Sequence, residues 1–520
     1  MRAPAGLSRH RVGREPARIR GFTPTAVVLC GLLGAAISLR IWTVISYKPA
    51  VLTTDVHDAA AYIGAAHLGL SWTITEPSGY PLFLRALHAV SHSLSVTIIF
   101  QHLLGLATGI LLFLSVRCLR VPAWLGLIPA AVVWFDGDQL FLEHAPLTEA
   151  LFTFLVAAML YASIRSLNGG MAWTVLAGAL AASTLAIRTV GVVLPVVVVA
   201  WLTLTRLRSR IAWKRAAVLA TAGAVLVIVG YGAVRDSGTG HWSITPAGSG
   251  WSLYARTAAF ADCRHFRPPS GAAVLCQRTP SATRESPSYY LWVGGPAKAA
   301  FGGIPSRDGT VGAFATAAIL HQPLDYLDAI WNDARSYVAP GAWPTWALDH
   351  GATSVDTLDF PWHHPPIDLA VGRQVASYYG PLPAPNLTGA HHLLDYQRLF
   401  RVTGTILLVL LVLGAAGLVS ATGTPRYGAT LFMAVSLALL LLPDLVLVTA
   451  WRYAVPALGP LAAAAAIGAW TLGLRLAQTR PRSWLLRTGK RPSEVEYDDG
   501  VAADSGRPSS PVRSRATDSP

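Results

Sequence analysis

Ten long apolar segments dominate this sequence and constrain its fold more than any other feature. They cover residues 23–46, 93–116, 121–135, 147–164, 171–187, 190–204, 216–234, 402–419, 427–450 and 454–474. A membrane-spanning helix needs about 20 mostly apolar residues, so the third, fifth and sixth segments are short and the count holds to about one span. Only 13% of the residues are charged, about half the share in soluble proteins. The sequence therefore predicts an all-α polytopic membrane protein with about ten transmembrane helices.

Basic residues collect on one side of the predicted spans. Residues 1–21 hold six arginines, and residues 475–491 add six basic side chains on the same side. Because Lys and Arg favour the cytoplasmic side, we expect a multi-pass plasma-membrane protein with both termini in the cytoplasm. The first span is too long for a cleaved signal peptide and should stay as an anchor. The net charge of +14 then reflects topology and attraction to membrane lipid, and no nucleic-acid partner is predicted.

The predicted spans divide the chain into five parts. These are a basic cytoplasmic tail (1–21), a transmembrane core with seven spans and a first outer loop at 47–92 (22–234), an extracytoplasmic loop domain between the seventh and eighth spans (235–398), the last three spans (399–475) and a cytoplasmic tail (476–520). The last part is rich in Pro, Ser, Arg and Asp, a composition typical of disorder.

Two of the four cysteines, Cys263 and Cys276, lie close together in the predicted loop domain. Outside the cytoplasm such a pair favours a disulfide, which would contribute on the order of 3 kcal/mol. A metal site is the less favoured alternative, because the pair lacks the Cys-x-x-Cys spacing.

Apart from the tails and the large loop, the chain holds eight acidic residues, and all map to the predicted outer side. They are Asp55, Asp58, Glu76, Asp136, Asp138, Glu143, Glu149 and Asp444. Ionisable groups at membrane depth are costly and usually line a functional cavity. We therefore expect a carboxylate-bearing cavity that opens on the extracytoplasmic side.

The first acids in this set have helical spacing. Asp55, Asp58 and Tyr62 stand at i, i+3 and i+7, so a helix places them on one face. Asp58 is either the cap of that helix or a functional carboxylate: a general base or, with Asp55, a ligand of a divalent cation. Glu143 and Glu149 belong to a group of four acids beside a span, which is more than capping requires.

Three arginines on the predicted outer side are candidates for holding an anion. Arg452 is the only basic residue at the junction of the last two spans, and Arg188 lies in a short outer turn. Because basic residues are disfavoured on this side, each should have a specific anionic partner, either a phosphate or one of the outer acids. For Arg85, on an expected interfacial helix, the alternative to a phosphate contact is snorkelling.

The order and placement of five short motifs resemble the GT-C superfamily of integral membrane glycosyltransferases, in particular its protein O-mannosyltransferase-like and aminoarabinose-transferase-like branches. The motifs are Asp58-x3-Tyr62-x3-Ala66, Ser78-Gly79-Tyr80-Pro81-Leu82, Leu147-Thr148-Glu149-Ala150-Leu151-Phe152, Arg188-Thr189-Val190-Gly191 and Arg452-Tyr453-x2-Pro456. They follow the family's order over residues 20–475. Of the 41 basic residues 37 are Arg, a bias typical of a GC-rich genome such as that of an actinobacterium.

The resemblance implies a GT-C-like fold and a glycosyltransferase that moves a hexose or pentose from a polyprenyl-phosphate sugar donor to a cell-envelope glycan, lipid or protein, usually with inversion. By position it implies that Asp58 is the catalytic base. The mechanism that we expect on this basis gives roles to seven more residues: Asp55 as second acid, Tyr62, Glu143 and Glu149 as orienting groups for the acceptor, and Arg452, Arg188 and Arg85 as donor-phosphate ligands. Relatives often carry two adjacent acids where this chain has Ala59 after Asp58, so a requirement for Mg or Mn stays open.

The alternative is a polytopic transporter or a flippase for lipid-linked sugars. Such folds often contain inverted repeats and carry their sites near the bilayer midplane. This sequence shows no repeat, and its acids lie at the predicted membrane surface, so the enzyme is favoured.

Overall fold

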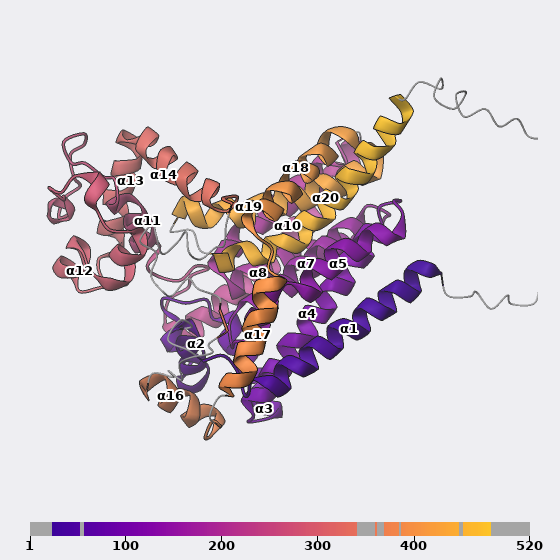
Figure 1. Cartoon of the computed structure of the whole chain (residues 1–520). Coiled ribbons are helices and arrows are strands. Elements are labelled where there is room, and N and C mark those ends of the chain that lie inside the picture. The colour runs from indigo at the N-terminus through magenta and orange to yellow at the C-terminus, as the bar shows by residue number, and fades with distance from the viewer. Residues whose placement is uncertain are drawn as a thin grey trace, which may run out of the picture. The chain divides into compact units, whose positions relative to one another are not determined.

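The computed structural model describes residues 23–52, 57–207, 209–340, 359–360, 369–383, 386–446 and 451–479. Within these ranges every regular element is a helix (Figure 1). The chain divides into two compact units, Met1–Leu474 and Arg475–Pro520, and all described residues except the end of the last helix belong to the first. The all-α prediction is confirmed for the part of the chain that the structure describes.

Six helices are long and apolar enough to cross a membrane. They are α1 (Pro24–Ser46), α4 (Leu94–Arg117), α7 (Glu149–Ser166), α10 (Arg210–Thr239), α19 (Gly423–Val446) and α20 (Trp451–Thr479). Two bent pairs would raise the number to eight: η3 (Ala123–Gly126) and α5 (Leu127–Phe135) with α6 (Gly137–His144), bent by 53°, and α17 (Leu387–Leu399) with α18 (Gly404–Ser420), bent by 41°.

The two remaining predicted spans form shorter apolar helices. They are α8 (Met171–Ile187), and η4 (Thr189–Val193) followed by α9 (Leu194–Leu204). Arg188 stands between them with an extended backbone, φ −145° and ψ 138°, which interrupts the helix. In their described residues all ten predicted segments are thus largely helical. Six to eight of them qualify as spans by length and composition, so the count of ten remains a prediction.

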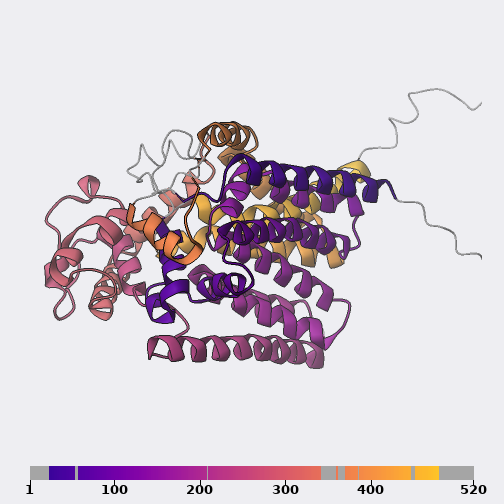
Figure 2. The same cartoon turned by 90° about the horizontal axis from the view of Figure 1, so that it is seen from below.

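Small residues bring neighbouring helices close together, most visibly α8 and α10. A Cβ added at Gly178 of α8 would lie 1.9 Å from the carbonyl oxygen of Ala220, and one at Gly223 of α10 would lie 2.1 Å from that of Val175. Such close backbone approach is how helices associate in lipid, where burial of apolar surface gives little driving force. The long helices run side by side in both views (Figures 1 and 2).

The first predicted outer loop folds into α2 (His57–Leu68), η2 (Leu70–Thr73) and α3 (Gly79–Val90). The Ala-rich run after Asp58 has high helix propensity, which accounts for α2. A side chain at Gly79 would clash with α8, since an added Cβ would lie 2.4 Å from the carbonyl oxygen of Ala186. The start of α3 is therefore pressed against the end of α8, two residues before Arg188.

The segment after α10 contains further helices and a core of its own. The helices are α11 (Ser249–Ala258), α12 (Pro296–Phe301), α13 (Asp308–His321), α14 (Pro323–Ser336) and α16 (Leu369–Tyr379). Trp251, Tyr254 and Phe314 are fully buried in a cluster that is separate from the main core. The loop domain expected at residues 235–398, with these boundaries, remains a prediction.

Cys263 and Cys276 are joined by a disulfide whose Cα atoms lie 5.8 Å apart. Both sulfur-bearing side chains pack against the second core. Cys30, which is exposed, and Cys118, which is half-buried, are free.

We predict that an alkylating reagent modifies two of the four cysteines in the denatured, unreduced protein and all four after reduction. Denaturation exposes the free thiols of Cys30 and Cys118, whereas bonded sulfurs cannot react. Mass spectrometry of the alkylated peptides gives the count. Four modified cysteines before reduction would contradict the disulfide and the predicted extracytoplasmic location of its loop.

Candidate active site

Asp58 and Arg452 form an ion pair between segments almost 400 residues apart in the sequence. Asp58 lies in the first turn of α2 and Arg452 in the first turn of α20. The Nη2 of Arg452 donates to Oδ2 of Asp58 over 2.6 Å. Their side chains remain 31% and 18% exposed, so both can still be reached by a ligand.

Glu149 lies between two arginines. It starts α7, and its carboxylate pairs with Arg188. Its Oε1 also lies 4.0 Å from Nε of Arg452. Arg188 donates a second hydrogen bond, 3.2 Å long, to the hydroxyl of Thr148. The side chain of Glu149 is only 2% exposed, so this carboxylate fixes the two guanidinium groups rather than facing solvent.

Aromatic rings pack against this group of charged residues. The Tyr453 ring lies under both guanidinium groups, with its centroid 5.1 Å from Cζ of Arg188 and 5.3 Å from Cζ of Arg452. Tyr62 of α2 is buried and packs edge-on against Tyr80 of α3, at 5.3 Å between centroids. Burial, with added repulsion from Glu76 and Asp58, raises the pKa of Tyr62 well above its usual value. The Tyr62 hydroxyl therefore stays protonated and can donate a hydrogen bond.

Glu76 is a third acid at this site. It precedes α3 and interacts electrostatically with Asp58, Arg452 and Arg188. It is partly exposed, yet enclosure by protein, with added repulsion from Asp58, raises the pKa of Glu76 to about 8. Below that pH its carboxyl is neutral, so the site then holds two arginines and two carboxylates.

Arg235 of α10 holds the turn that carries Glu76. Its Nη1 donates to the carbonyl oxygens of Thr73 and Glu76, over 3.1 and 3.0 Å, and to the Ser78 hydroxyl over 3.0 Å. Arg235 is only 2% exposed. The two N–H groups of this buried nitrogen are shared among the three acceptors and hold the turn around Glu76, so α10 sets the position of this acid.

Asp138 holds the start of α20 in a similar way. Its Oδ2 accepts from the indole of Trp451 over 2.7 Å, and Trp451 is the residue before Arg452. Its Oδ1 accepts from Arg401 and Gln397, each over 2.8 Å. Asp138 therefore serves to place Arg452.

The structure brings together Asp58, Tyr62, Glu149, Arg188 and Arg452, five of the eight residues for which the sequence suggested a role. Asp55 lies outside the described residues. Arg85 is exposed on α3 and interacts electrostatically with Tyr378 of α16. Among the described residues, no ion pair joins Arg85 to the acids that hold Arg188 and Arg452.

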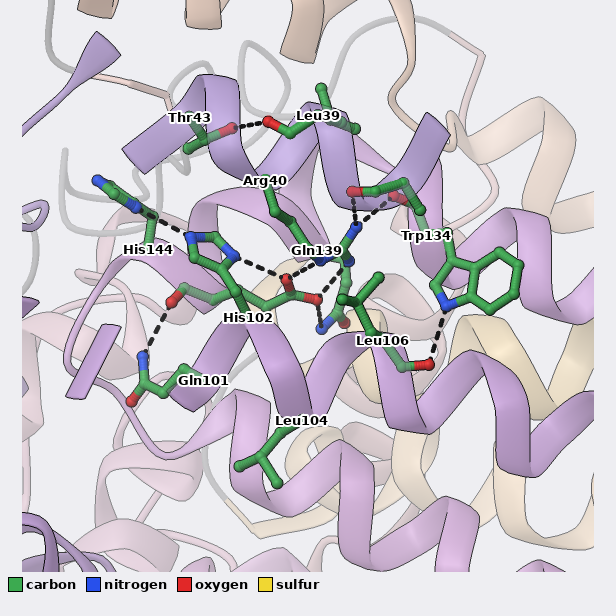
Figure 3. Close-up of polar contacts among 12 residues, drawn as sticks. Leu39, Arg40, Thr43, Gln101, His102, Leu104, Leu106, Trp134, Gln139 and His144 are labelled. Carbon is green, nitrogen blue, oxygen red and sulfur yellow. Dashed lines mark hydrogen bonds and ion pairs between the residues drawn. The ribbon is translucent and has the colours of Figure 1, made fainter. Parts of the chain in front are cut away.

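Glu143 is buried in a different group of polar side chains, which includes Arg40, His102 and Gln139 (Figure 3). Its two carboxylate oxygens accept from Nε and Nη2 of Arg40, each over 2.9 Å. His102 Nδ1 and Gln139 Nε2 each lie 3.0 Å from the same carboxylate. Glu143 is completely buried and its oxygens are fully engaged, so in the structure it holds helices together instead of facing an acceptor.

Several residues of these two groups had no role assigned from the sequence, among them Arg40, Glu76 and Arg235. Arg40 was counted as part of an apolar span, although a charge inside a span is itself a signal of a buried partner. Glu76 could have been recognised because it directly precedes the Pro77–Pro81 turn. Arg235 directly follows a predicted span, where an arginine usually marks only the end of the apolar segment, so its type and position gave no sign of its role.

Within the described residues no group of three or more His, Cys, Asp or Glu side chains is arranged to hold a metal ion. Asp58 and Glu149 are each already paired with an arginine, which makes these two carboxylates poor cation ligands. A divalent cation at Asp55 and Asp58 remains untested, since Asp55 is not described.

No family model matches this chain, and no curated protein matches it. Among solved structures, the chain is similar to ArnT from Cupriavidus metallidurans, in a crystal structure with undecaprenyl phosphate. The likeness covers 91% of this chain and 82% of that chain, with 15% identical residues and a TM-score of 0.33.

We predict that Arg40→Met destabilises the fold by about 3–5 kcal/mol, because it leaves the buried Glu143 carboxylate without its ion-pair partner. Thermal unfolding in detergent micelles measures the loss. The double variant Arg40→Met, Glu143→Gln removes both charges and should lose clearly less. Equal losses for the single and the double variant would contradict the ion pair as the source of the effect.

Proposed function

We propose that this protein is a membrane glycosyltransferase of the GT-C type that uses a polyprenyl-phosphate-linked sugar donor. The observation that carries the proposal is the meeting of Arg188 and Arg452 with the partly exposed carboxylate of Asp58 at the ends of α8, α20 and α2. Two guanidinium groups suit a phosphate, and a neighbouring carboxylate suits a hydroxyl that must lose a proton. The five sequence motifs shared with that superfamily point to the same activity.

In the proposed reaction an acceptor hydroxyl oxygen attacks the anomeric carbon of the donor sugar. The bond between that carbon and the phosphate oxygen breaks, and its electron pair stays on the phosphate. Asp58 takes the hydroxyl proton. Arg452 and Arg188 stabilise the negative charge that grows on the leaving polyprenyl phosphate. Attack from the face opposite the leaving group gives inversion.

The Asp58–Arg452 ion pair suggests an order of binding. While Asp58 accepts from Arg452, its Oδ2 is engaged by the guanidinium group and not by an acceptor hydroxyl. A donor phosphate would compete with Asp58 for this guanidinium group and so release Asp58 as a base beside the bound sugar. We infer that the donor binds before the acceptor.

The remaining residues of the site fit supporting roles. Tyr62, a protonated and buried phenol on the same face of α2 as Asp58, is placed to donate to a sugar or acceptor oxygen. Glu149 keeps Arg188 oriented through their ion pair. The sugar, the acceptor and a divalent-cation requirement are not assigned by these contacts.

We predict that Asp58→Asn lowers kcat for transfer by about 10²–10⁴-fold, the range typical of a lost general base. Donor affinity should be unchanged or higher, because Asn no longer neutralises Arg452. Transfer from a radiolabelled polyprenyl-phosphate sugar to an envelope extract measures kcat, and donor titration gives the affinity. Asp395→Asn, at an exposed position of α17, is the matched control. Full transfer by Asp58→Asn would show that Asp58 is not the base.

We predict that the KM for the donor rises as the pH increases through about 8. Glu76, whose pKa is raised to about 8, is neutral below this pH and becomes negative above it. The new charge opposes an anionic phosphate beside Arg452 and Arg188. Glu76→Gln removes this ionisation and should abolish the rise in KM, measured between pH 6.5 and 9. An identical alkaline rise in Glu76→Gln would assign it to another group.

A further inference from the structure

Helix α14 carries an apolar stripe that no part of the described chain covers. Leu324, Leu327 and Trp331 stand at i, i+3 and i+7, so they share one face. They are 78%, 58% and 66% exposed. Leu320, at the end of the preceding helix α13, is also largely exposed. A contiguous apolar face of this kind normally marks an interaction surface.

The opposite face of α14 is attached to the helical bundle. The Tyr326 hydroxyl donates to the backbone carbonyl of Leu445, near the end of α19, over 2.6 Å. Asp333 on the same inner side pairs with Arg256 of α11. Figure 1 shows α14 reaching from α13 to α19. The helix is therefore held along its polar side, and its apolar side is turned away from the protein.

The surface of α19 beside this attachment is itself apolar. Leu437, Leu441 and Leu445 stand at i, i+4 and i+8 and are each more than a third exposed. Because α19 is one of the six helices suited to cross a membrane, this row is the surface it presents to lipid. The row ends at Leu445, the residue that binds Tyr326 of α14. The two exposed apolar faces thus adjoin each other at the end of a span.

We propose that α14 lies in the membrane interface, with Leu324, Leu327 and Trp331 inserted among the lipids of the leaflet beside the end of α19. A helix with one apolar face and one polar face binds a bilayer in this way. Trp331 fits the position, since tryptophan collects at the boundary between lipid and water. The charged side chains that border the stripe, Asp328 and Arg335, are exposed and can reach the headgroups.

This contact would tie the bilayer surface to the candidate site. The residue after α14, Tyr337, packs on Trp451 with 6.3 Å between ring centroids, and Trp451 precedes Arg452. Lipid insertion of α14 would therefore help to fix the start of α20 at a constant depth. The inference concerns lipid contact alone and stands whether or not the proposed glycosyl transfer is correct.

Site-directed spin labelling of the full chain in lipid nanodiscs tests the proposal. The background carries Cys30→Ala and Cys118→Ala and keeps the Cys263–Cys276 disulfide. Leu324→Cys, Leu327→Cys and Trp331→Cys are labelled one at a time with a nitroxide, and Asp325→Cys, exposed on another face of α14, is the matched control. Collisions with oxygen, which concentrates in lipid, and with a water-soluble nickel chelate report the surroundings of each label.

We expect the ratio of oxygen to nickel accessibility to be several-fold higher at all three stripe positions than at Asp325→Cys. Three separate positions keep the test decisive if one variant fails to fold. A ratio equal to the control would place the stripe in water and overturn the proposal. Low accessibility to both reagents, with spin–spin broadening, would mean that a second copy of the chain covers the stripe, and would overturn it as well.

Discussion

The pairing of opposite charges at the ends of apolar helices is the constraint on which this structure depends. A charge that leaves water without a partner costs several kcal/mol, so each one buried here must meet an opposite charge or several hydrogen-bonding groups. Asp58 meets Arg452, and Glu149 meets Arg188. Each pair joins segments that are distant in the sequence, so charge pairing selects which helix ends come together. The apolar lipid-facing surfaces of the same helices do little to specify which helices are neighbours.

The helices could be predicted well because apolar length is a local property of the sequence. Their interruptions were harder to predict. Asp136 ends the helix before it and caps the next one by accepting from the Gln139 amide over 2.8 Å, and Arg188 breaks what would otherwise be a longer helix. Both breaks depend on capping and pairing with residues elsewhere in the fold. Neither contact is visible in hydropathy, so hydropathy predicts that these helices exist but does not predict where they break, and the number of spans depends on the breaks.

The candidate site could be predicted in part for a related reason. Residue type and the predicted side of the membrane were enough to group Asp58, Glu149 and Arg452. Acids and arginines that lie on the same side of a bilayer are expected to form ion pairs with one another. They were not enough to separate Glu143 from that group, because its true partner, Arg40, comes from inside the first span. What distinguishes Glu143 from Asp58 is the exposure of the side chain to solvent. Glu143 is completely buried with three side-chain partners, whereas Asp58 keeps 31% of its side chain exposed.

This difference indicates how one fold can use acids both for stability and for chemistry. A carboxylate with every lone pair satisfied by fixed donors cannot exchange a partner without exposing a buried charge, so it serves stability. Asp58 pairs with Arg452, and both side chains keep some exposure to solvent, so a phosphate could replace Asp58 at little cost. Arg452 is adjacent to Trp451, whose indole is fixed by Asp138 over 2.7 Å. The backbone of Arg452 is thereby anchored by the buried acid Asp138, while its side chain pairs with Asp58, which a ligand can displace. Binding an anionic headgroup at a fixed depth requires this combination of a fixed backbone and a side chain with an exchangeable partner.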